Sequence, residues 1–240
     1  PSLAVGLVQI PDFLETHGVH IIPTPNPDGI AHGTRQNANG IDLNRTWLSL
    51  SQPESRAIAL LLGRLRPLLL VDHHEADPQL SANVTFAPPS APPTDPVILT
   101  RAGDLITATK AAMTTNGWTV GDYATTGEPN RLVSNLGIRH AVAMLVETSV
   151  SQTDTVRVAQ QRECALVAIA YAMAEMPGLQ QDSDAAAQRA TTAGADGDAF
   201  DLNNGIVLDP APLGYQLSGV LPELHLEAFG IQVIGARASM

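Results

Sequence analysis

Two short apolar runs, separated by helical segments, constrain the fold of this 240-residue chain more than any other feature. The runs cover residues 68–71 and 141–146. An apolar run this short is typical of a strand buried inside a parallel sheet. Helical patterns over residues 57–65, 95–116 and 153–175 alternate with the two runs. The alternation predicts an α/β fold with a mixed, mainly parallel sheet whose two faces are both covered by helices.

Weaker patterns predict the other elements of the main domain. Residues 3–16 have the pattern of a short helix, residues 19–22 that of a buried strand, and residues 118–120 that of a short edge strand. Residues 76–94 and 121–137 are rich in proline, glycine and polar side chains, so we expect long surface loops there. Loops of this length inside a compact domain are usually functional or mobile.

Composition changes after Pro177 and Gly178, which are expected to end the last helix and the main domain, residues 1–178. Residues 179–200 are low in hydrophobicity, which predicts a flexible linker. Residues 201–240 hold a short apolar pattern and are expected to form a C-terminal appendage, because they are too few for a confident independent domain.

Charge and cysteine content exclude several classes of partner and site. The net charge of −11 argues against nucleic acid or an anionic membrane surface as a partner. The single cysteine, Cys164, excludes an internal disulfide and a cysteine-based metal cluster, and its alanine-rich surroundings predict a small core residue. No apolar run approaches the length that would span a bilayer.

A polar segment over residues 26–47, with the sequence NPDGIAHGTRQNANGIDLNRTW, follows the predicted strand at residues 19–22. Polar, glycine-rich sequence at the end of such a strand is where an open α/β sheet usually forms its binding site. Arg35 and Arg45 each carry a planar fork of N–H donors that suits a carboxylate or an oxyanion, and Asn44 is a third donor beside them. The segment is therefore a candidate site for reading a carboxylate.

Titratable side chains follow both predicted central strands. Asp72-His73-His74-Glu75 comes after the first run, and alternation along a strand places His73 and His74 on opposite faces. Glu147 closes the second run, where burial raises the pKa of a carboxylate and suits it to act as a general base.

The order NPDG, then an arginine, then G-x-DLNR-x-W resembles the substrate-binding segment of the zinc carboxypeptidase family. The resemblance continues through Tyr123, Gly127 and the N-x-G-I sequence of residues 135–138, and it reaches Glu147. It implies a three-layer α/β/α sandwich and a zinc-dependent enzyme that cleaves a C-terminal peptide bond. A secreted or periplasmic location is slightly favoured by the same resemblance, and residues 1–178 would be the catalytic domain.

The resemblance also implies roles for individual residues. A peptide or another small carboxylate-bearing substrate is the expected partner. Zn²⁺ is the expected cofactor, with His74 as the preferred ligand and His73 as the alternative. An arginine at position 131 would favour acidic C-terminal side chains. The expected roles are catalysis for Glu147 and Arg35, substrate binding for Asn44, Arg45 and Tyr123, and zinc binding for His74.

The sequence departs from the family pattern at one point, because it contains no H-x-x-E, the motif that supplies the other two zinc ligands. His17 and His20 have the spacing H-x-x-H but are expected to be turn and surface residues. We therefore expect an incomplete chain whose upstream part carries H-x-x-E. Two alternatives stay open: a zinc amidohydrolase of the same fold that acts on acylated amino acids, and a non-catalytic relative that binds a carboxylate.

Overall fold

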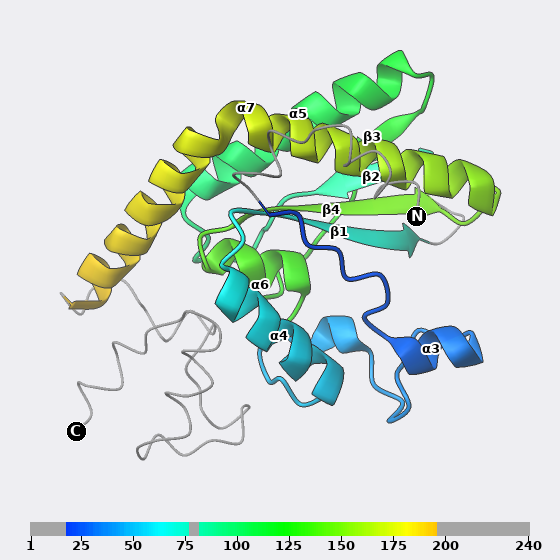
Figure 1. Cartoon of the computed structure of the whole chain (residues 1–240), viewed down its shortest axis with the longest axis horizontal. Helices are drawn as coiled ribbons and strands as arrows, with labels where there is room; N and C mark the ends of the chain where they lie inside the picture. The colour runs from blue at the N-terminus through cyan, green and yellow to red at the C-terminus, as the bar shows by residue number, and fades with distance from the viewer. Residues whose placement is uncertain (1–17, 77–81, 196–240) are drawn as a thin grey trace.

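The computed structural model describes residues 18–76 and 82–195 and contains one four-stranded sheet (Figure 1). The strand order is β1-β4-β2-β3. β1 pairs with β4 and β2 with β3 in parallel, while β2 and β4 are antiparallel, so the predicted mixed, mainly parallel sheet is confirmed. The strands are β1 (Leu69–Ala76), β2 (Val84–Ala87), β3 (Val120–Asp122) and β4 (Val142–Ser149).

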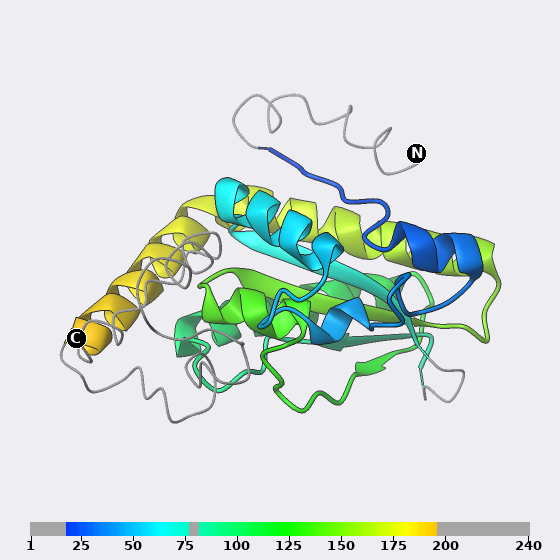
Figure 2. The same cartoon turned by 90° about the horizontal axis from the view of Figure 1, so that it is seen from below.

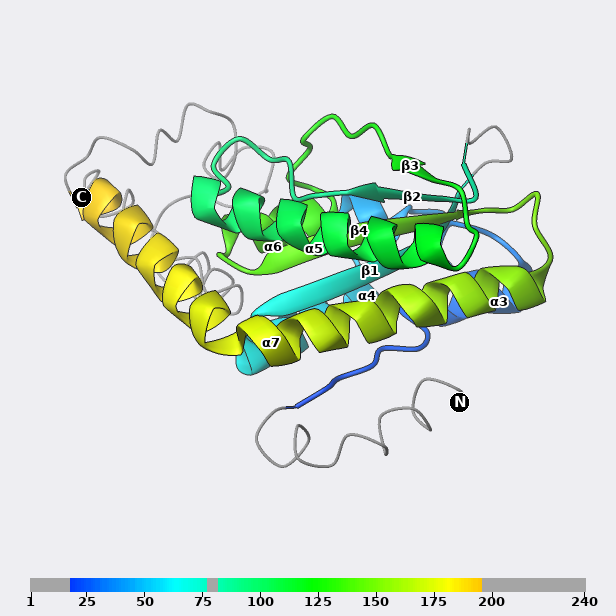
Figure 3. The same cartoon turned by 90° about the horizontal axis from the view of Figure 1, so that it is seen from above.

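Helices cover both faces of the sheet, which confirms the three-layer α/β/α architecture. Helices α5 (Pro96–Thr115) and α7 (Asp154–Ala195) lie on one face (Figure 3). On the other face lie α4 (Pro53–Leu65) and α6 (Leu132–Ile138) (Figure 2). The short helices α3 (Pro27–His32) and η1 (Leu43–Arg45) belong to the polar segment and lie on the same side as α4.

Strand β4 is buried along its whole length and divides the core into two clusters. Val142, Met144 and Val146 pack with residues of α5 and α7, while Ala143 and Leu145 pack with residues of α4 and α6. This is the period-two alternation expected of a strand covered on both faces. Glu147 is two residues beyond Leu145 on the same strand, so it lies on the face that α4 and α6 cover.

Helix α5 matches its predicted bounds because its ends carry clear signals. The Asp95 side chain accepts a hydrogen bond from the backbone N–H of Val97 at 2.9 Å, and Pro96 occupies the first turn. Gly117, just past the C-cap residue Asn116, has a φ of 85°, a value that suits glycine. Cys164, predicted to be a core residue, is fully buried against Met113 of this helix.

The strand predicted over residues 19–22 is wrong. These residues have no regular structure, and Ile21 and Ile22 are 50% and 40% exposed. A four-residue apolar run becomes a strand only if a neighbouring strand accepts its backbone hydrogen bonds. Among the described residues, the edge strand β1 pairs only with β4.

Two short elements lie where loops were predicted. β2 is fully buried inside the predicted loop over residues 76–94, and α6 begins inside the predicted loop over residues 121–137 and ends one residue beyond it. Four and seven residues are too few for a periodic pattern to stand out. Strand β3 confirms the predicted edge strand, shifted toward Asp122.

Helix α7 runs through Pro177 to Ala195, so the predicted helix end at residue 175 is wrong. The helix bends part-way along (Figure 3), as a proline inside a helix produces. Leu179 beyond the proline is 1% exposed, and Asp182 accepts a hydrogen bond from the Arg101 guanidinium of α5 at 2.6 Å. These contacts lie beyond the proline and oppose the penalty of about 3 kcal/mol that an internal proline imposes on a helix.

Part of the predicted linker is therefore helical, over residues 179–195. The predicted helix over residues 3–16 and the appendage over residues 201–240 lie outside the described residues, and the division into domains stays a prediction. Within residues 18–76 and 82–195, no helix has the length and apolar character needed to cross a bilayer.

Candidate functional site

A cavity of about 260 Å³ opens between the polar segment, the ends of β1 and β4, and the start of α6. Its walls combine three guanidinium groups with three carboxylates and one imidazole. All six residues that the sequence singled out line it. The lining residues are Arg35, Asn44, Arg45, Asp72, His74, Glu75, Ala76, Ala87, Pro88, Tyr123, Thr125, Arg131, Val133, Ser134, Leu145 and Glu147.

His74 and Glu147 lie side by side at the centre of the site, because they are register partners on the parallel strands β1 and β4. Neighbouring residues at one register position project from the same face of a sheet. His73 faces the opposite side, where its Nδ1 bonds to the side chain of Gln161 on α7. Of the two histidines considered from the sequence, His74 is thus the one in the cavity.

The His74 ring lies between acidic groups. Its Nε2 is 3.1 Å from Oδ2 of Asp72 and 3.4 Å from Nδ2 of Asn44. The Asp72 carboxylate is close enough to form an ion pair with the ring when the ring is protonated. Burial disfavours the charged ring, but the carboxylates of Asp72 and Glu147 outweigh burial and raise the pKa of His74 above its ordinary value.

Glu147 has the environment expected of a general base. The residue is 7% exposed, and its Oε2 has no hydrogen-bond partner among the described residues. Burial raises the pKa of the Glu147 carboxyl, an effect that His74 and Arg35 oppose and the charge of Asp72 reinforces. A buried carboxylate with a raised pKa is chemically suited to accept a proton from a molecule in the cavity.

Two arginines of the polar segment are held by one aspartate. Arg35 Nε donates to Oδ2 of Asp42 at 2.8 Å, and Arg45 Nη1 lies 4.0 Å from the same oxygen. Arg45 Nη1 also donates to the backbone O of Asn44 at 2.7 Å. Burial opposes ionisation of Asp42, but the hydrogen bond and charge of Arg35 outweigh it and lower the pKa of Asp42. Asp42 is thus an anchor that keeps both guanidinium groups at the cavity.

The first turn of the segment fixes the chain that carries Arg35. Asn26 accepts a hydrogen bond from the N–H of Gly29 at 2.9 Å and donates to the backbone O of Arg35 at 3.0 Å. A Cβ on Gly29 would lie 2.6 Å from the backbone O of Thr34 and closer still to the Asn26 side chain. The asparagine and the glycine of NPDG therefore have a local structural reason for their identity.

Side-chain amides fix the turn between Arg35 and Asp42, and those of Asn37 and Gln52 are buried. Nδ2 of Asn37 donates to Oε1 of Gln52 at 3.0 Å, and Oδ1 of Asn37 accepts from the N–H of Ile41 at 3.1 Å. Asn39 donates to the same Gln52 oxygen at 2.9 Å. Since Gln52 immediately precedes α4, these bonds attach the polar segment to the start of that helix.

Asn44 joins the polar segment to α6. Its Oδ1 accepts a hydrogen bond from the N–H of Leu132 at 2.8 Å, which leaves Nδ2 directed toward His74. Trp47, predicted to be packing, is buried and donates its backbone N–H to the O of Asn130 at 3.2 Å. The Oδ1 of Asn44 is therefore occupied by a hydrogen bond within the protein, whereas its Nδ2 can donate to a ligand.

Tyr123 and Arg131 enter the cavity from the loop between β3 and α6. The backbone N–H of Tyr123 donates to the O of Phe86 at 2.8 Å, which attaches the start of the loop to β2. Arg131 precedes α6 as its N-cap residue, and its Nε donates to Oε2 of Glu128 at 3.0 Å. Arg131 is also close enough to lower the pKa of Glu147, against the larger effect of burial.

Sequence reasoning assigned no role of its own to several cavity residues. Asp72 precedes His74 by two positions on a strand, so alternation alone would have placed both on one face. Thr125 and Ser134 had no comparable signal in the sequence, because residues 121–137 were predicted as one long loop and the start of α6 was not recognised.

A complete metal site is not formed by the described residues. Within residues 18–76 and 82–195, no group of three or more His, Cys, Asp or Glu side chains is arranged to hold a metal ion. Among the residues that the structure describes, His74 supplies the one imidazole that lines the cavity. Of the pair considered from the sequence, His20 is exposed, as predicted, and His17 lies outside the described residues. The described residues thus fit one ligand of a three-ligand zinc site.

Comparisons with known proteins give short matches to hydrolases. No family model matches the sequence. Carboxypeptidase SOL1 of Arabidopsis thaliana is 40% identical over 22% of this chain and 13% of its own length. Probable carboxypeptidase 2 of Trichophyton verrucosum is 33% identical over 36% of this chain and 16% of its length. Murein peptide amidase A of Escherichia coli is 29% identical over 31% of this chain and 42% of its length.

A solved structure shares the fold. The metallo-carboxypeptidase from Burkholderia cenocepacia superposes with a TM-score of 0.54 and 22% identity, over 65% of this chain and 45% of that one. The chain spans between 13% and 42% of the length of the curated relatives above. The comparisons therefore establish a metallo-carboxypeptidase-like fold and a similarity to carboxypeptidases and an amidase.

Proposed function

We propose that this protein is a metallocarboxypeptidase-like hydrolase that cleaves the C-terminal peptide bond of a peptide. One observation carries the proposal: the His74 ring and the Glu147 carboxylate share a cavity with the guanidinium groups of Arg35 and Arg45. A nearly buried carboxylate facing two carboxylate-binding groups suits hydrolysis next to a free C-terminus. The similarity to carboxypeptidases supports the same assignment.

Substrate binding is assigned to the polar segment and the loop after β3. The guanidinium of Arg45 and the Nδ2 of Asn44 hold the terminal carboxylate, with the hydroxyl of Tyr123 as a further donor. These groups fix the scissile bond relative to the β1–β4 strand ends. Positioning of this kind can supply a large share of a rate enhancement.

Bond cleavage is assigned to Glu147 and Arg35. Glu147 removes a proton from the attacking water as the new C–O bond forms, and it returns that proton to the leaving amine as the C–N bond breaks. Arg35 donates N–H groups to the oxygen that becomes negatively charged. The pKa of Glu147, raised by burial, favours the proton-accepting half of this cycle near neutral pH.

Zinc is the proposed cofactor, and His74 is the ligand that the described residues supply. When bound, zinc acts as a Lewis acid and lowers the pKa of a bound water. A histidine ligand usually has a carboxylate beside it, and Asp72 Oδ2 lies 3.1 Å from the Nε2 of His74. The described residues do not complete the ligand set.

Arg45→Ala tests the proposed function. Loss of the guanidinium is expected to raise KM for a blocked dipeptide with a free C-terminus roughly 10- to 100-fold, because charge-assisted bonds contribute about 1.5–3 kcal/mol. Steady-state kinetics should show little change in kcat, and the C-terminal amide of the same dipeptide should be a poor substrate for the wild type. Equal rates on the acid and the amide would contradict C-terminal recognition.

Arg131 is proposed to select acidic C-terminal side chains, because its guanidinium lines the cavity. Blocked dipeptides ending in Glu, Lys and Phe should differ in kcat/KM, with Glu preferred by roughly tenfold or more, as expected for a charge-assisted pair. Arg131→Gln should remove the preference without abolishing activity. Equal kcat/KM on all three substrates would refute the assignment.

A zinc amidohydrolase is the second candidate, favoured by the match to murein peptide amidase A, which covers 42% of that protein. It would use the same base but a pocket closed to peptides. Activity on acylated amino acids together with none on blocked dipeptides would select it.

A non-catalytic carboxylate binder is the third candidate, favoured by the incomplete ligand set in the described residues. Binding of the blocked dipeptide without any turnover, in the presence of Zn²⁺, would select that role.

A further inference from the structure

Gln161 of helix α7 contacts the back of the sheet directly behind the two histidines. Its Nε2 donates to the backbone O of His74 at 2.8 Å and to Oγ1 of Thr148 at 3.0 Å. Its Oε1 accepts a hydrogen bond from Nδ1 of His73. A glutamine amide has two N–H donors and one carbonyl acceptor, so every polar group of this side chain is used.

These contacts join the two strands that carry the site. Thr148, which is fully buried, also donates its hydroxyl to the backbone O of His74 at 3.3 Å. Thr148 follows Glu147 directly, and His73 precedes His74. The Gln161 network therefore fixes the residue next to each cavity-facing side chain, from the face of the sheet opposite to the cavity.

Strand β1 needs such a constraint because it is an edge strand. Among the described residues, it pairs only with β4. A slip of one residue would reverse the faces of the strand and bring His73 into the cavity in place of His74. In the observed register, Gln161 bonds at the same time to the ring of His73, the backbone O of His74 and the hydroxyl of Thr148 on the paired strand, and a one-residue slip of β1 would break this set.

We propose that Gln161 is a positioning residue of this site, which holds β1 in register with β4 so that the His74 ring and the Glu147 carboxylate lie side by side. Gln161 does not line the cavity and touches no proposed substrate-binding group. Its effect is therefore on the geometry of the reacting groups. The catalytic consequence rests on the proposed function, whereas the register consequence rests on the hydrogen bonds alone.

Two variants of Gln161 and one control test the proposal in the full chain. Gln161→Leu removes all three hydrogen bonds at similar volume, and Gln161→Glu keeps an acceptor for His73 but loses both N–H donors. Gln180→Leu makes the same chemical change at an exposed position of α7, where the amide donates to Asp184 of the same helix and has no other partner among the described residues. Each protein is assayed with a blocked dipeptide in the presence of Zn²⁺, and amide hydrogen exchange is followed in residues 69–76.

Gln161→Leu is expected to lower kcat about 10- to 100-fold, in the range of other groups that orient a reacting side chain. KM should stay within about twofold, because the carboxylate-binding residues are untouched. Exchange in residues 69–76 should become at least about tenfold faster. Gln161→Glu should lie between Gln161→Leu and the wild type, and Gln180→Leu should match the wild type in both measurements.

Wild-type kcat in both Gln161 variants would overturn the proposal. Loss of folded protein in Gln161→Glu, in parallel with its loss of kcat, would also overturn it, because Gln161 would then be a purely structural residue. If the wild type shows no hydrolysis, the proposed function fails and hydrogen exchange alone decides the positioning role. Unchanged exchange in residues 69–76 would then overturn it, and faster exchange confined to the Gln161 variants would support it.

Discussion

Glu147→Gln is expected to lower kcat for a blocked dipeptide roughly 10²- to 10⁴-fold, the range that general-base catalysis contributes. The amide has nearly the same shape as the carboxylate but cannot accept the proton of an attacking water. KM should change little, because the proposed carboxylate-binding groups, Arg45 and Asn44, belong to a different segment. Steady-state kinetics with purified variants would measure both constants.

The stability of the metal-free protein separates lost chemistry from lost folding. The pKa of Glu147 is raised in the folded state, so the folded protein holds this proton more tightly than the unfolded chain. Ionisation of Glu147 therefore destabilises the folded state as the pH rises from the ordinary pKa of a glutamate to the raised pKa of Glu147. Glu147→Gln should then be no less stable than the wild type at pH 7. Its thermal midpoint should not fall.

Glu163→Gln is the matched control for Glu147→Gln. Glu163 is a partly buried carboxylate on α7 that accepts a hydrogen bond from Nε1 of Trp118 at 3.3 Å, on the face of the sheet away from the cavity. It should keep wild-type kcat. Normal turnover in Glu147→Gln would refute the base assignment, whereas an equal loss in both variants would point to a general effect of removing a carboxylate.

The convergence of the site residues could be predicted because it follows from sheet geometry. Parallel strands place their carboxyl ends at one edge of a sheet, so polar residues after residues 71 and 146 had to meet. Alternation then placed only one of His73 and His74 on the face of Glu147. The structure confirms this arrangement in the register of β1 and β4.

Short elements could not be predicted, because tertiary packing decides them. The four residues of β2 are buried between β3 and β4, and nothing in VTFA beside a proline-rich stretch distinguishes them from loop. The reverse error occurred at residues 19–22, where a local apolar pattern lacks a pairing strand.

Pro177 shows a third kind of failure, in which a reliable local rule is overridden. Proline normally ends a helix, but contacts made further along α7 hold the helix through it. Arg189 of α7 forms two hydrogen bonds with Asp95, at 2.8 and 2.9 Å. These bonds span 94 positions in sequence, so no local pattern could reveal them.

Arg35→Ala is expected to lower kcat about 10²- to 10³-fold, the loss measured when one donor to a developing oxyanion is removed. Arg35 uses its Nε for Asp42, and among the described residues neither Nη atom has a hydrogen-bond partner. The two Nη groups are therefore what this side chain can offer to the reacting carbonyl. Arg35→Lys should recover only part of the activity, because an ammonium lacks the planar fork.

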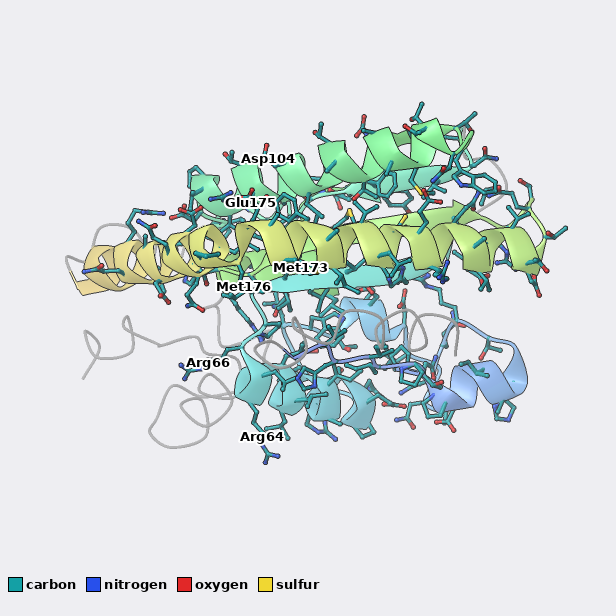
Figure 4. All side chains as sticks on the ribbon, turned by 45° about the horizontal axis from the view of Figure 1, so that its top comes forward. Arg64, Arg66, Asp104, Met173, Glu175 and Met176 are labelled. Carbon is teal, nitrogen blue, oxygen red and sulfur yellow. The ribbon has the colours of Figure 1, made fainter. Side chains whose placement is uncertain are left out.

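Asp42 and Arg64 supply the comparisons that make this result specific. Asp42→Asn keeps both arginines but weakens their anchor, so it should lower kcat and raise KM together, each by less than the corresponding arginine variant. Arg64→Ala removes an exposed guanidinium at the end of α4, where the side chain points away from the sheet (Figure 4), and should match the wild type. A larger effect of Arg35→Ala on KM than on kcat would reassign Arg35 from the oxyanion to the terminal carboxylate, because uniform binding is lost mainly in KM.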